Sequence, residues 1–407
     1  MNLTSSRAML ALAYAIAAVG GASFGLVLPV LPDLLASVGA PDSGTAAQMG
    51  GLLIAAFAVM QLVAAPVFGA LSDAYGRKPI LVFALSLGAI GHGAMALAPN
   101  LGLLIGARAL TGLSAAAFVA LSAMIADKVA PEMRATVFGR LSAADGAGLV
   151  AGPAVVGLLA EQSLRAPFVL VASLDIALLL LALFFLRETL AAQNRRPLLV
   201  SDMTPLRTLR MAASVPGNRA ILSMVALFSL GILSLPMMWA YFTDVRFGWG
   251  PAEIGFSMSV LGIATIAANG VLLPVLRRYF CDKTILQTAL IAGPILMVWL
   301  AFNTIEPVIY VLVVLLAQMG IAFSVLAGML SANTPPDQQG GLQGGLGVID
   351  SGTAIIAPFL YPLVFAASLT FGTEFAGMPF VVGAVSILLA VFYLRLIAAD
   401  TLRRSSA

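Results

Sequence analysis

Long apolar segments alternate with short polar segments along the whole 407-residue chain. A helix of about 20 apolar residues crosses the roughly 30 Å hydrocarbon core of a bilayer, and twelve segments of this kind recur. They cover residues 8–35, 48–71, 79–98, 101–127, 134–160, 167–187, 219–243, 252–277, 283–302, 306–332, 338–366 and 376–396. The pattern predicts an all-α membrane protein with twelve transmembrane helices.

The composition agrees with this class, because 61% of the residues are hydrophobic and only 10% are charged. The first apolar segment is longer than the core of a cleavable signal peptide, and Pro29 and Pro32 lie inside it. We therefore expect this segment to remain as the first span.

The cationic residues follow the loops. If the loop after the second span is cytoplasmic, loops on that side hold seventeen of the 21 Lys and Arg residues, whereas Arg165 and Arg246 fall on the other side. The positive-inside rule then places both termini in the cytoplasm. The seventeen residues are Arg7, Arg77, Lys78, Lys128, Arg134, Arg187, Arg195, Arg196, Arg207, Arg210, Arg219, Arg277, Arg278, Lys283, Arg395, Arg403 and Arg404. They form no single basic patch, so we expect no nucleic-acid partner.

The longest polar interruption, residues 188–218, divides six predicted spans from six. We predict an N-terminal six-helix bundle over residues 1–187, a cytoplasmic linker over 188–218 and a C-terminal six-helix bundle over 219–407. An offset of 205 residues aligns parts of the two halves weakly and places Asp145 over Asp350. Such internal repeats are common in membrane folds that arose by duplication.

Residues 68–80, FGALSDAYGRKPI, place an aspartate, an arginine and a lysine directly after an apolar segment. The glycine permits a tight turn, and the two cations keep the loop in the cytoplasm. A carboxylate at the edge of hydrocarbon is costly unless a cation or a helix N-terminus faces it. From the residues alone, the segment is either a loop that sets the topology with one incidental acid, or a functional cluster.

This segment resembles the G-x-L-x-D-x-x-G-R-K signature of the major facilitator superfamily. The matching residues are Gly69, Leu71, Asp73, Gly76, Arg77 and Lys78. Other segments resemble Gram-negative tetracycline efflux proteins, and on this resemblance the chain is identified as a member of the drug:proton antiporter branch. These segments are GLVLPVLPDLL in span 1, SAMIAD closing span 4, AGP in span 5, FTDVRFGW after span 7 and QQGGLQG opening span 11.

The resemblance implies a major facilitator fold, in which two pseudo-symmetric six-helix bundles rock about a central cavity. It also implies a conformational latch on the cytoplasmic face, formed by the motif residues together with Asp127. In this latch Asp73, Arg77 and Asp127 make a charge cluster near the start of span 11. The cluster would hold the outward-open state and yield when the bundles move.

Span 5 carries a second motif, GLVAGPAVVG. Gly148 and Gly152 form a small-xxx-small face for helix packing, and Pro153 removes one backbone hydrogen bond. In this superfamily a Gly-Pro motif in span 5 accompanies antiport, and export is therefore expected. The alternative is ordinary helix packing with no bearing on direction.

The chain departs from the tetracycline exporters at their membrane carboxylates. Those proteins carry aspartates in spans 1, 3 and 9 and a histidine in span 8, where local matching places Gly20, Gly91, Gly293 and Thr265. His92 is adjacent to the span 3 position. Because a tetracycline–magnesium cation and a proton both need anionic sites, the resemblance does not carry tetracycline over as the substrate.

Other charged residues lie inside the apolar segments. At 1.5 Å per residue, Asp145 in span 5 and Asp350 in span 11 come to lie roughly 16 to 18 Å deep, near the bilayer midplane. Charges at that depth face a cavity or a partner rather than lipid. We predict Asp145 as the leading proton-binding residue and Asp350 as the second. Further candidates for proton coupling are Arg108, Asp175 and His92. The alternative is a fixed Asp–Arg pair that holds helices together.

Candidate substrate contacts come from spans 1, 4, 7 and 10, which line the cavity in this superfamily, with polar additions from spans 2 and 8. They are Phe24, Gln61, Phe118, Met237, Met238, Trp239, Asn269, Gln318 and Asn333. Aromatic and methionine residues in a membrane helix also face lipid or pack against other helices, and this alternative stays open for each of them.

The sequence therefore predicts a secondary active transporter of the bacterial inner membrane, which exports a small amphipathic drug or metabolite in exchange for protons. An importer or facilitator on the same fold is the alternative. One charge crossing 100 mV supplies about 2.3 kcal/mol, enough for a roughly fifty-fold gradient, and the chain has no G-x-x-x-x-G-K-[ST] nucleotide loop.

A single cysteine, Cys281, excludes an intramolecular disulfide and a Cys-based metal cluster. With one histidine and no clustered carboxylates, little remains for a metal or nucleophilic site. We therefore expect no enzyme activity, no cofactor and no metal. The expected partners are the small-molecule substrate, protons and the lipid bilayer, with the protein acting as a monomer.

Overall fold

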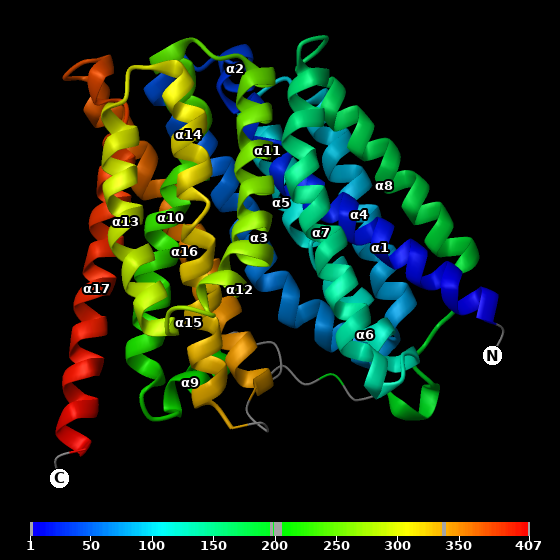
Figure 1. Ribbon diagram of the computed structural model, residues 1–407. Coiled ribbons are helices and arrows are strands. Elements are labelled where there is room, and N and C mark those ends of the chain that lie inside the picture. The colour runs from blue at the N-terminus through cyan, green and yellow to red at the C-terminus, as the bar shows by residue number, and fades with distance from the viewer. Residues whose placement is uncertain (1–2, 196–197, 199–205, 336–338, 406–407) are drawn as a thin grey trace. The chain divides into compact units, whose positions relative to one another are not determined.

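The computed structural model describes residues 3–195, 198, 206–335 and 339–405. In this part of the chain the regular elements are helices (Figure 1). The α-helices of the N-terminal part are α1 (Leu3–Gly25), α2 (Leu31–Ser37), α3 (Ser43–Tyr75), α4 (Arg77–Leu97), α5 (Leu101–Ser114), α6 (Ala117–Lys128), α7 (Pro131–Ala160) and α8 (Ala166–Phe185). Those that follow are α9 (Leu206–Ser214), α10 (Asn218–Phe247), α11 (Pro251–Ala267), α12 (Leu273–Leu276), α13 (Asp282–Phe302), α14 (Glu306–Leu316), α15 (Met319–Asn333), α16 (Gln339–Leu369) and α17 (Met378–Ser405).

Within the described residues, twelve helical segments are long and apolar enough to cross a membrane. Each overlaps one of the twelve predicted segments, which confirms the all-α membrane class. Some spans contain more than one helix. The fourth changes from α5 to α6 at Ala115–Ala116, and the tenth changes from α14 to α15 at Ala317–Gln318. The eighth contains a π-helical turn, Ala268–Leu272, between α11 and α12.

The chain forms two compact units. Unit 1 contains residues 1–40, 52–204 and 251–256, and unit 2 contains residues 41–51, 205–250 and 257–407. Helices α3 and α11 therefore contribute to both units. Of the predicted linker, residues 196–197 and 199–205 lie outside the described part of the chain; the helix α9 begins directly after them.

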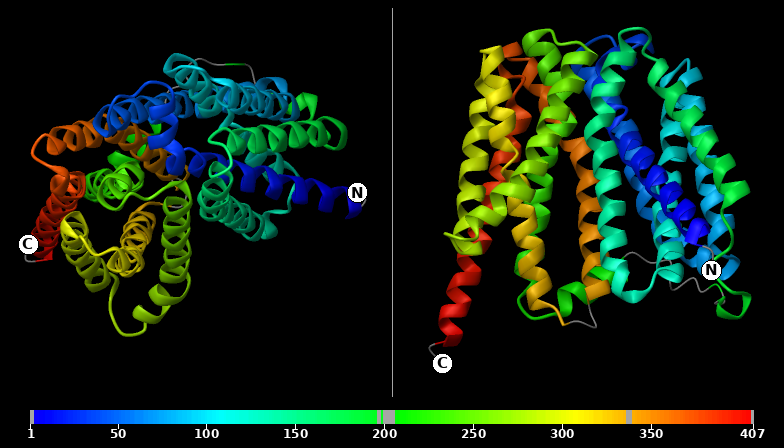
Figure 2. Two further views of the ribbon diagram at one scale, coloured as in Figure 1. Left: turned by 90° about the horizontal axis from the view of Figure 1, so that it is seen from above. Right: turned by 45° about the vertical axis from the view of Figure 1, so that its right-hand side comes forward.

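Unit 1 is organised around two tightly packed helix pairs, α1 with α7 and α4 with α8. Helices α1 and α7 run side by side (Figure 2), and glycine permits their close approach. A Cβ atom on Gly148 of α7 would lie only 1.9 Å from the carbonyl oxygen of Ala18, and one on Gly21 of α1 would lie 2.0 Å from the carbonyl oxygen of Asp145. The backbones of the two helices are therefore in direct contact.

Unit 2 repeats features of unit 1. Helix α13 spans Asp282–Phe302 and α4 spans Arg77–Leu97, a shift of 205 residues at both ends. The breaks within the fourth and tenth spans also lie at similar places in the two units. Helix α10 packs against α16 and α17, and the hydroxyl of Tyr361 donates to the carbonyl oxygen of Leu230 at 2.6 Å.

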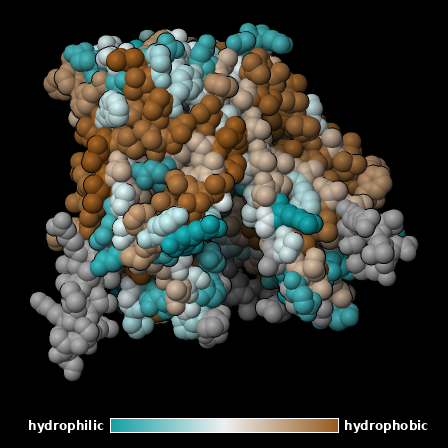
Figure 3. All heavy atoms as spheres, in the orientation of Figure 1, coloured by the Kyte–Doolittle hydropathy of each residue, from teal (hydrophilic) through white to brown (hydrophobic). Residues whose placement is uncertain are grey.

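Part of the outer surface of each unit is apolar. Figure 3 shows hydrophobic side chains gathered over α13 in one unit and over α8 in the other. Leu180, Phe184 and Phe185 on α8 and Ile295 and Trp299 on α13 are exposed. A water-soluble protein would not present such faces, but they suit contact with lipid.

The two cations predicted outside the cytoplasmic loops both bind the C-terminal ends of helices. Arg165 donates to the carbonyl oxygens of Met95 and Ala98 at 2.9 and 2.7 Å, at the end of α4. Arg246 donates to the carbonyl oxygen of Ala301 at 3.2 Å, at the end of α13. Such carbonyls have no partner within their own helix and favour a positive charge. Desolvation lowers the pKa of Arg165 from its ordinary value of 12.5.

Candidate functional site

Unit 1 contains a partly open cavity of about 400 Å³. Helices α1, α3, α4, α5, α6, α7 and α8 all contribute to its lining. Three aromatic rings from three helices form part of the wall, those of Phe24, Phe57 and Phe118. The rings of Phe24 and Phe57 meet edge to face at 5.9 Å, while Phe24 and Phe118 keep 41% and 39% of their surface exposed. The cavity is thus largely apolar, with accessible ring surfaces.

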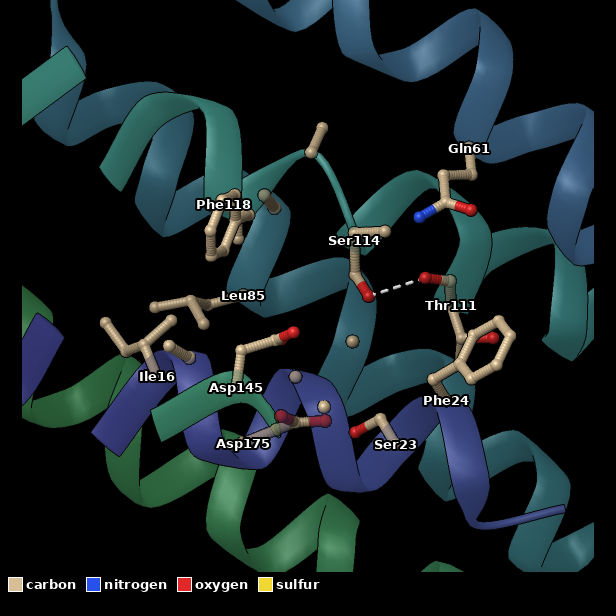
Figure 4. A pocket seen from close by; sticks show the side chains of 18 of the residues that line it. Ile16, Ser23, Phe24, Gln61, Leu85, Thr111, Ser114, Phe118, Asp145 and Asp175 are labelled. Carbon is tan, nitrogen blue, oxygen red and sulfur yellow. Dashed lines mark hydrogen bonds between the residues drawn. The ribbon is translucent and has the colours of Figure 1, made fainter. Parts of the chain in front are cut away.

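Asp145 projects from α7 into this cavity (Figure 4). Its side chain is half-buried, and no ion pair or hydrogen bond to its carboxylate is found in the described residues. Its backbone carbonyl faces Gly21, at the contact between α1 and α7. The carboxylate is therefore held by a rigid helix crossing and remains available to a ligand or a proton.

A second acid lies deeper in the same cavity. Nδ1 of His92 on α4 lies 2.7 Å from Oδ2 of Asp175 on α8, and the two residues are only 1% and 6% exposed. Gly88 makes room for the carboxylate, since a Cβ atom there would lie 3.1 Å from the same oxygen. Nε2 of His92 is buried and has no hydrogen-bond partner in the described residues. The two side chains form a buried His–Asp pair that lines the cavity.

Arg108 of α5 does not pair with either carboxylate. Its guanidinium carbon lies 4.5 Å from the ring centroid of Phe57, and the residue is 2% exposed. This is a cation–π contact, in which the face of the ring attracts the charge. Nε and Nη1 of Arg108 have no hydrogen-bond partner in the described residues. A fixed ion pair of Asp145 with Arg108 or with the exposed Arg140 is therefore not found in this structure.

Asp350, the counterpart of Asp145 at the offset of 205 residues, lies on α16 of unit 2. Its side chain is exposed, and the hydroxyl of Ser229 on α10 donates to its Oδ1 at 3.5 Å. The cavity of unit 1 does not include it. Asp350 therefore belongs to the described residues of unit 2, and its role in proton binding stays a prediction.

Of the predicted substrate contacts, Phe24, Gln61 and Phe118 line the cavity of unit 1. The others lie in unit 2. Met237, Met238 and Trp239 are buried, and Trp239 donates from Nε1 to Oγ of Ser257 at 2.8 Å. Asn269 lies in the π-helical turn and accepts a hydrogen bond from Ser324 at 2.7 Å; Gln318 lies beside the break between α14 and α15. Asn333 donates to Pro216 and Asn218. Their contact with substrate stays a prediction.

The motif of residues 69–78 forms a charge cluster within unit 1. Nη1 of Arg77 pairs with Asp73, and its Nε lies 3.3 Å from Oδ2 of Asp127 at the end of α6. Gly76 has φ +115°, a conformation that side chains rarely adopt, and it precedes the first residue of α4. Lys78 donates to the carbonyl oxygen of Leu183 near the end of α8, at 2.8 Å. The motif thus ties together the ends of four helices, α3, α4, α6 and α8. The predicted approach of Asp73 to span 11 stays a prediction.

Glu188 completes this cluster and was missed by the sequence analysis. Its carboxylate accepts hydrogen bonds from four backbone N–H groups, those of Arg77 at 3.0 Å, Lys78 at 3.2 Å, Thr189 at 2.8 Å and Leu190 at 2.9 Å. Burial raises the pKa of Glu188, but the four hydrogen bonds outweigh it and hold the pKa below the ordinary value. Glu188 therefore caps the N-terminus of α4 with a negative charge.

Sequence comparison decides the family of this chain. Residues 10–358 match the family model described as Major Facilitator Superfamily. The chain belongs to the major facilitator superfamily. It is 35% identical over 371 residues to the tetracycline resistance protein, class C, of Escherichia coli. The alignment covers 91% of this chain and 92% of that protein. It is 26% identical to multidrug resistance protein 2 of Bacillus subtilis, with coverage of 88% and 89%.

Solved structures of the major facilitator superfamily share the fold. A bacterial homologue of the human lysosomal transporter Spinster, in an inward-facing and unoccupied conformation, matches with a TM-score of 0.77 over 99% of this chain and 98% of that chain. The sequence identity is 15%, so this likeness concerns the fold alone.

Two glycines that local matching places at carboxylate positions, Gly20 and Gly91, differ in the space around them. Gly20 lines the cavity and has open space at its Cβ position. A Cβ atom on Gly91 would lie 2.7 Å from Cγ2 of Thr111 and 3.0 Å from the carbonyl oxygen of Ala107. Helices α4 and α5 are therefore too close at Gly91 for any side chain, and the acid group of this region is the neighbouring His92–Asp175 pair.

Proposed function

We propose that this protein is a proton-coupled antiporter of the bacterial inner membrane, which exports a small amphipathic compound by alternating access. Membership of the superfamily and the names of the relatives, which are tetracycline and multidrug resistance proteins, support export of a drug-like molecule. The positive-inside rule supports placing both termini in the cytoplasm. We also propose that the protein works as a monomer and does no covalent chemistry on its substrate.

The cavity of unit 1 carries this proposal. It combines exposed aromatic surface with two acid groups, Asp145 and the His92–Asp175 pair, which come from separate helices. An amphipathic molecule needs apolar walls with a few polar groups placed among them. A coupled proton needs an acid group in reach of water. Both requirements are met within one space of about 400 Å³.

Proteoliposomes test the proposal. The protein is reconstituted with a pH-sensitive dye inside, and a panel of amphipathic compounds is added. An antiporter moves protons in the direction opposite to its substrate, so a substrate gradient must change the luminal pH. A pH gradient must in turn drive uphill movement of the substrate. Accumulation in the same direction as the protons would indicate an importer, and equilibration without proton movement would indicate a facilitator.

A carboxylate variant makes the test specific to the cavity. We expect Asp145→Asn to abolish transport driven by a pH gradient, because an acid group of the cavity is lost. The matched control is Glu161→Gln, which replaces an exposed carboxylate at the end of the same helix by an amide. The control is expected to transport at the parent rate. Equal uphill transport by Asp145→Asn and the parent would contradict the role of this cavity.

A further inference from the structure

The His92–Asp175 pair has one position that the protein itself does not use. The carboxylate of Asp175 at 2.7 Å holds a proton on Nδ1 of His92 and so leaves the lone pair on Nε2. This nitrogen is buried and without a hydrogen-bond partner in the described residues, although His92 lines the cavity. A buried acceptor left unpaired is unfavourable. Nε2 is therefore the ring nitrogen at which a further proton can bond.

We propose that the His92–Asp175 pair binds the transported proton at Nε2 of His92, and that a monocationic aromatic ligand bound at Asp145 competes with this proton. This inference rests on the proposed antiport function and divides its two tasks between two sites in one cavity. The proton comes from water on one side of the membrane and forms an N–H bond at Nε2. It leaves from the same atom to water on the other side.

The net charge in and beside the cavity explains why the proton and the cationic ligand compete. The charged groups in and beside the cavity are Asp145 on α7, Asp175 on α8 and Arg108 on α5, and the lining residues from α1, α3 and α6 include no titratable group. With His92 neutral, two negative charges and one positive charge leave a net charge of −1. A proton on Nε2 or a bound monocation brings the cavity to neutrality, but both together leave an unbalanced positive charge. Like charges in a space of low dielectric repel strongly.

The wall of the cavity selects the ligand class. Phe24, Phe57 and Phe118 offer ring faces, which attract organic cations as well as apolar groups. The ring of Phe57 already holds the guanidinium of Arg108, so Phe24 and Phe118 remain for the ligand. Figure 4 shows these two rings on different sides of the space into which Asp145 points. A cation with aromatic substituents can therefore contact the carboxylate and both rings.

The proton site can be observed directly, because His92 is the only histidine of the chain. The full-length protein, labelled with ¹⁵N-histidine and purified through a tag without histidine, gives one pair of ring signals in NMR. We expect the tautomer with hydrogen on Nδ1 at high pH and a single protonation at Nε2 as the pH is lowered. In Asp175→Asn we expect His92 to lose its preference for hydrogen on Nδ1, because the carboxylate that accepts from Nδ1 is gone. Saturating tetraphenylphosphonium, a permanent monocation, is expected to displace the proton from Nε2.

Binding measurements test the competition separately. The Kd of the parent for tetraphenylphosphonium is expected to rise about tenfold for each pH unit below the protonation step, because one proton is displaced per cation. In His92→Gln the Kd becomes independent of pH. In Asp145→Asn binding weakens at least about tenfold, while His92 still titrates. Triphenylphosphine oxide, a neutral molecule of similar shape, binds without pH dependence, and Glu161→Gln behaves like the parent.

Several results would overturn the inference. A His92 ring that stays neutral over the whole range excludes it as the proton site, and this measurement on the parent does not depend on the folding of any variant. Absence of tetraphenylphosphonium binding, or binding without proton displacement, excludes the competing monocation. Gradient-driven export by His92→Gln would also exclude the pair while leaving the antiport function intact. Absence of any proton-coupled transport by the parent contradicts the antiport function itself.

Discussion

Oε1 of Glu188 accepts a hydrogen bond from the backbone N–H of Arg77 at 3.0 Å, which joins the segment after α8 to the start of α4. We expect Glu188→Gln to lower the stability of the detergent-solubilised protein by about 1–2 kcal/mol, because a neutral amide accepts these bonds more weakly than a carboxylate. Thermal unfolding followed by fluorescence measures the change, with Glu161→Gln as the control.

The same contact predicts a dependence on pH. The folded-state pKa of Glu188 lies below the ordinary value of 4.5, so its carboxylate stabilises the folded state above that pH. This contribution is lost as the pH falls from 4.5 through the lowered pKa. The difference in melting temperature between the parent and Glu188→Gln should therefore narrow in this window. A difference that stays constant from pH 7 to about pH 3 would contradict the assignment.

Arg77 contacts two carboxylates through two different nitrogens, Nη1 toward Asp73 and Nε toward Asp127. A lysine has a single charged nitrogen and cannot reproduce this geometry. We expect Arg77→Lys to reduce transport at least about tenfold but to change stability by less than about 1 kcal/mol, since lysine keeps the charge and both carboxylates are partly exposed to solvent, where ion pairs contribute little. Flux in proteoliposomes and thermal unfolding measure the two effects. Full transport by this variant would exclude a latch, whereas a large loss of stability would indicate a structural role.

Two glycines of α7 provide a matched test of the contact between α1 and α7. A Cβ atom on Gly148 would lie 1.9 Å from the carbonyl oxygen of Ala18, whereas Gly146 has open space. Gly146→Ala should be neutral or stabilising by up to about 1 kcal/mol, because alanine favours a helix. Gly148→Ala should separate the helices and lower the melting temperature and the transport rate. Equal behaviour of the two variants would show that the contact does not matter.

Two other glycines test where the cavity accepts a new carboxylate. Gly20→Asp should fold, because the Cβ position faces open space, and it should strengthen binding of tetraphenylphosphonium by adding a negative charge to the cavity. Gly91→Asp should fold poorly, since its Cβ atom would clash with Thr111 and Ala107. Size-exclusion chromatography and binding at pH 8 distinguish the two. A well-folded Gly91→Asp protein would show that α4 and α5 separate more easily than their packing implies.

The spans and the pairing of Asp73 with Arg77 could be predicted because their signals are local, whereas Asp127 was added to the cluster only through the family resemblance. Twelve apolar segments are visible by length alone, and Asp73 and Arg77 are four residues apart on a recognisable motif. The pairing of His92 with Asp175 could not be predicted, because 83 residues separate them and only the packing of α4 on α8 brings them together. Glu188 was missed for a similar reason, as its partners in α4 lie about 110 residues earlier in the chain. In the sequence, Phe57 cannot be told apart from the other apolar residues of its span. Its cation–π contact with Arg108 is visible only in the structure.

The carbonyl oxygen of Asp145 faces Gly21, where α7 and α1 touch through their backbones. No side chain lies between the two helices at this point, so we expect α1 and α7 to move together as one rigid body. A change of charge on the Asp145 carboxylate is therefore expected to displace both helices together. Phe24 lies on α1 and lines the cavity, so its ring would shift together with α7. Binding or release of a cation at Asp145 would therefore change the position of a ring that contacts the ligand.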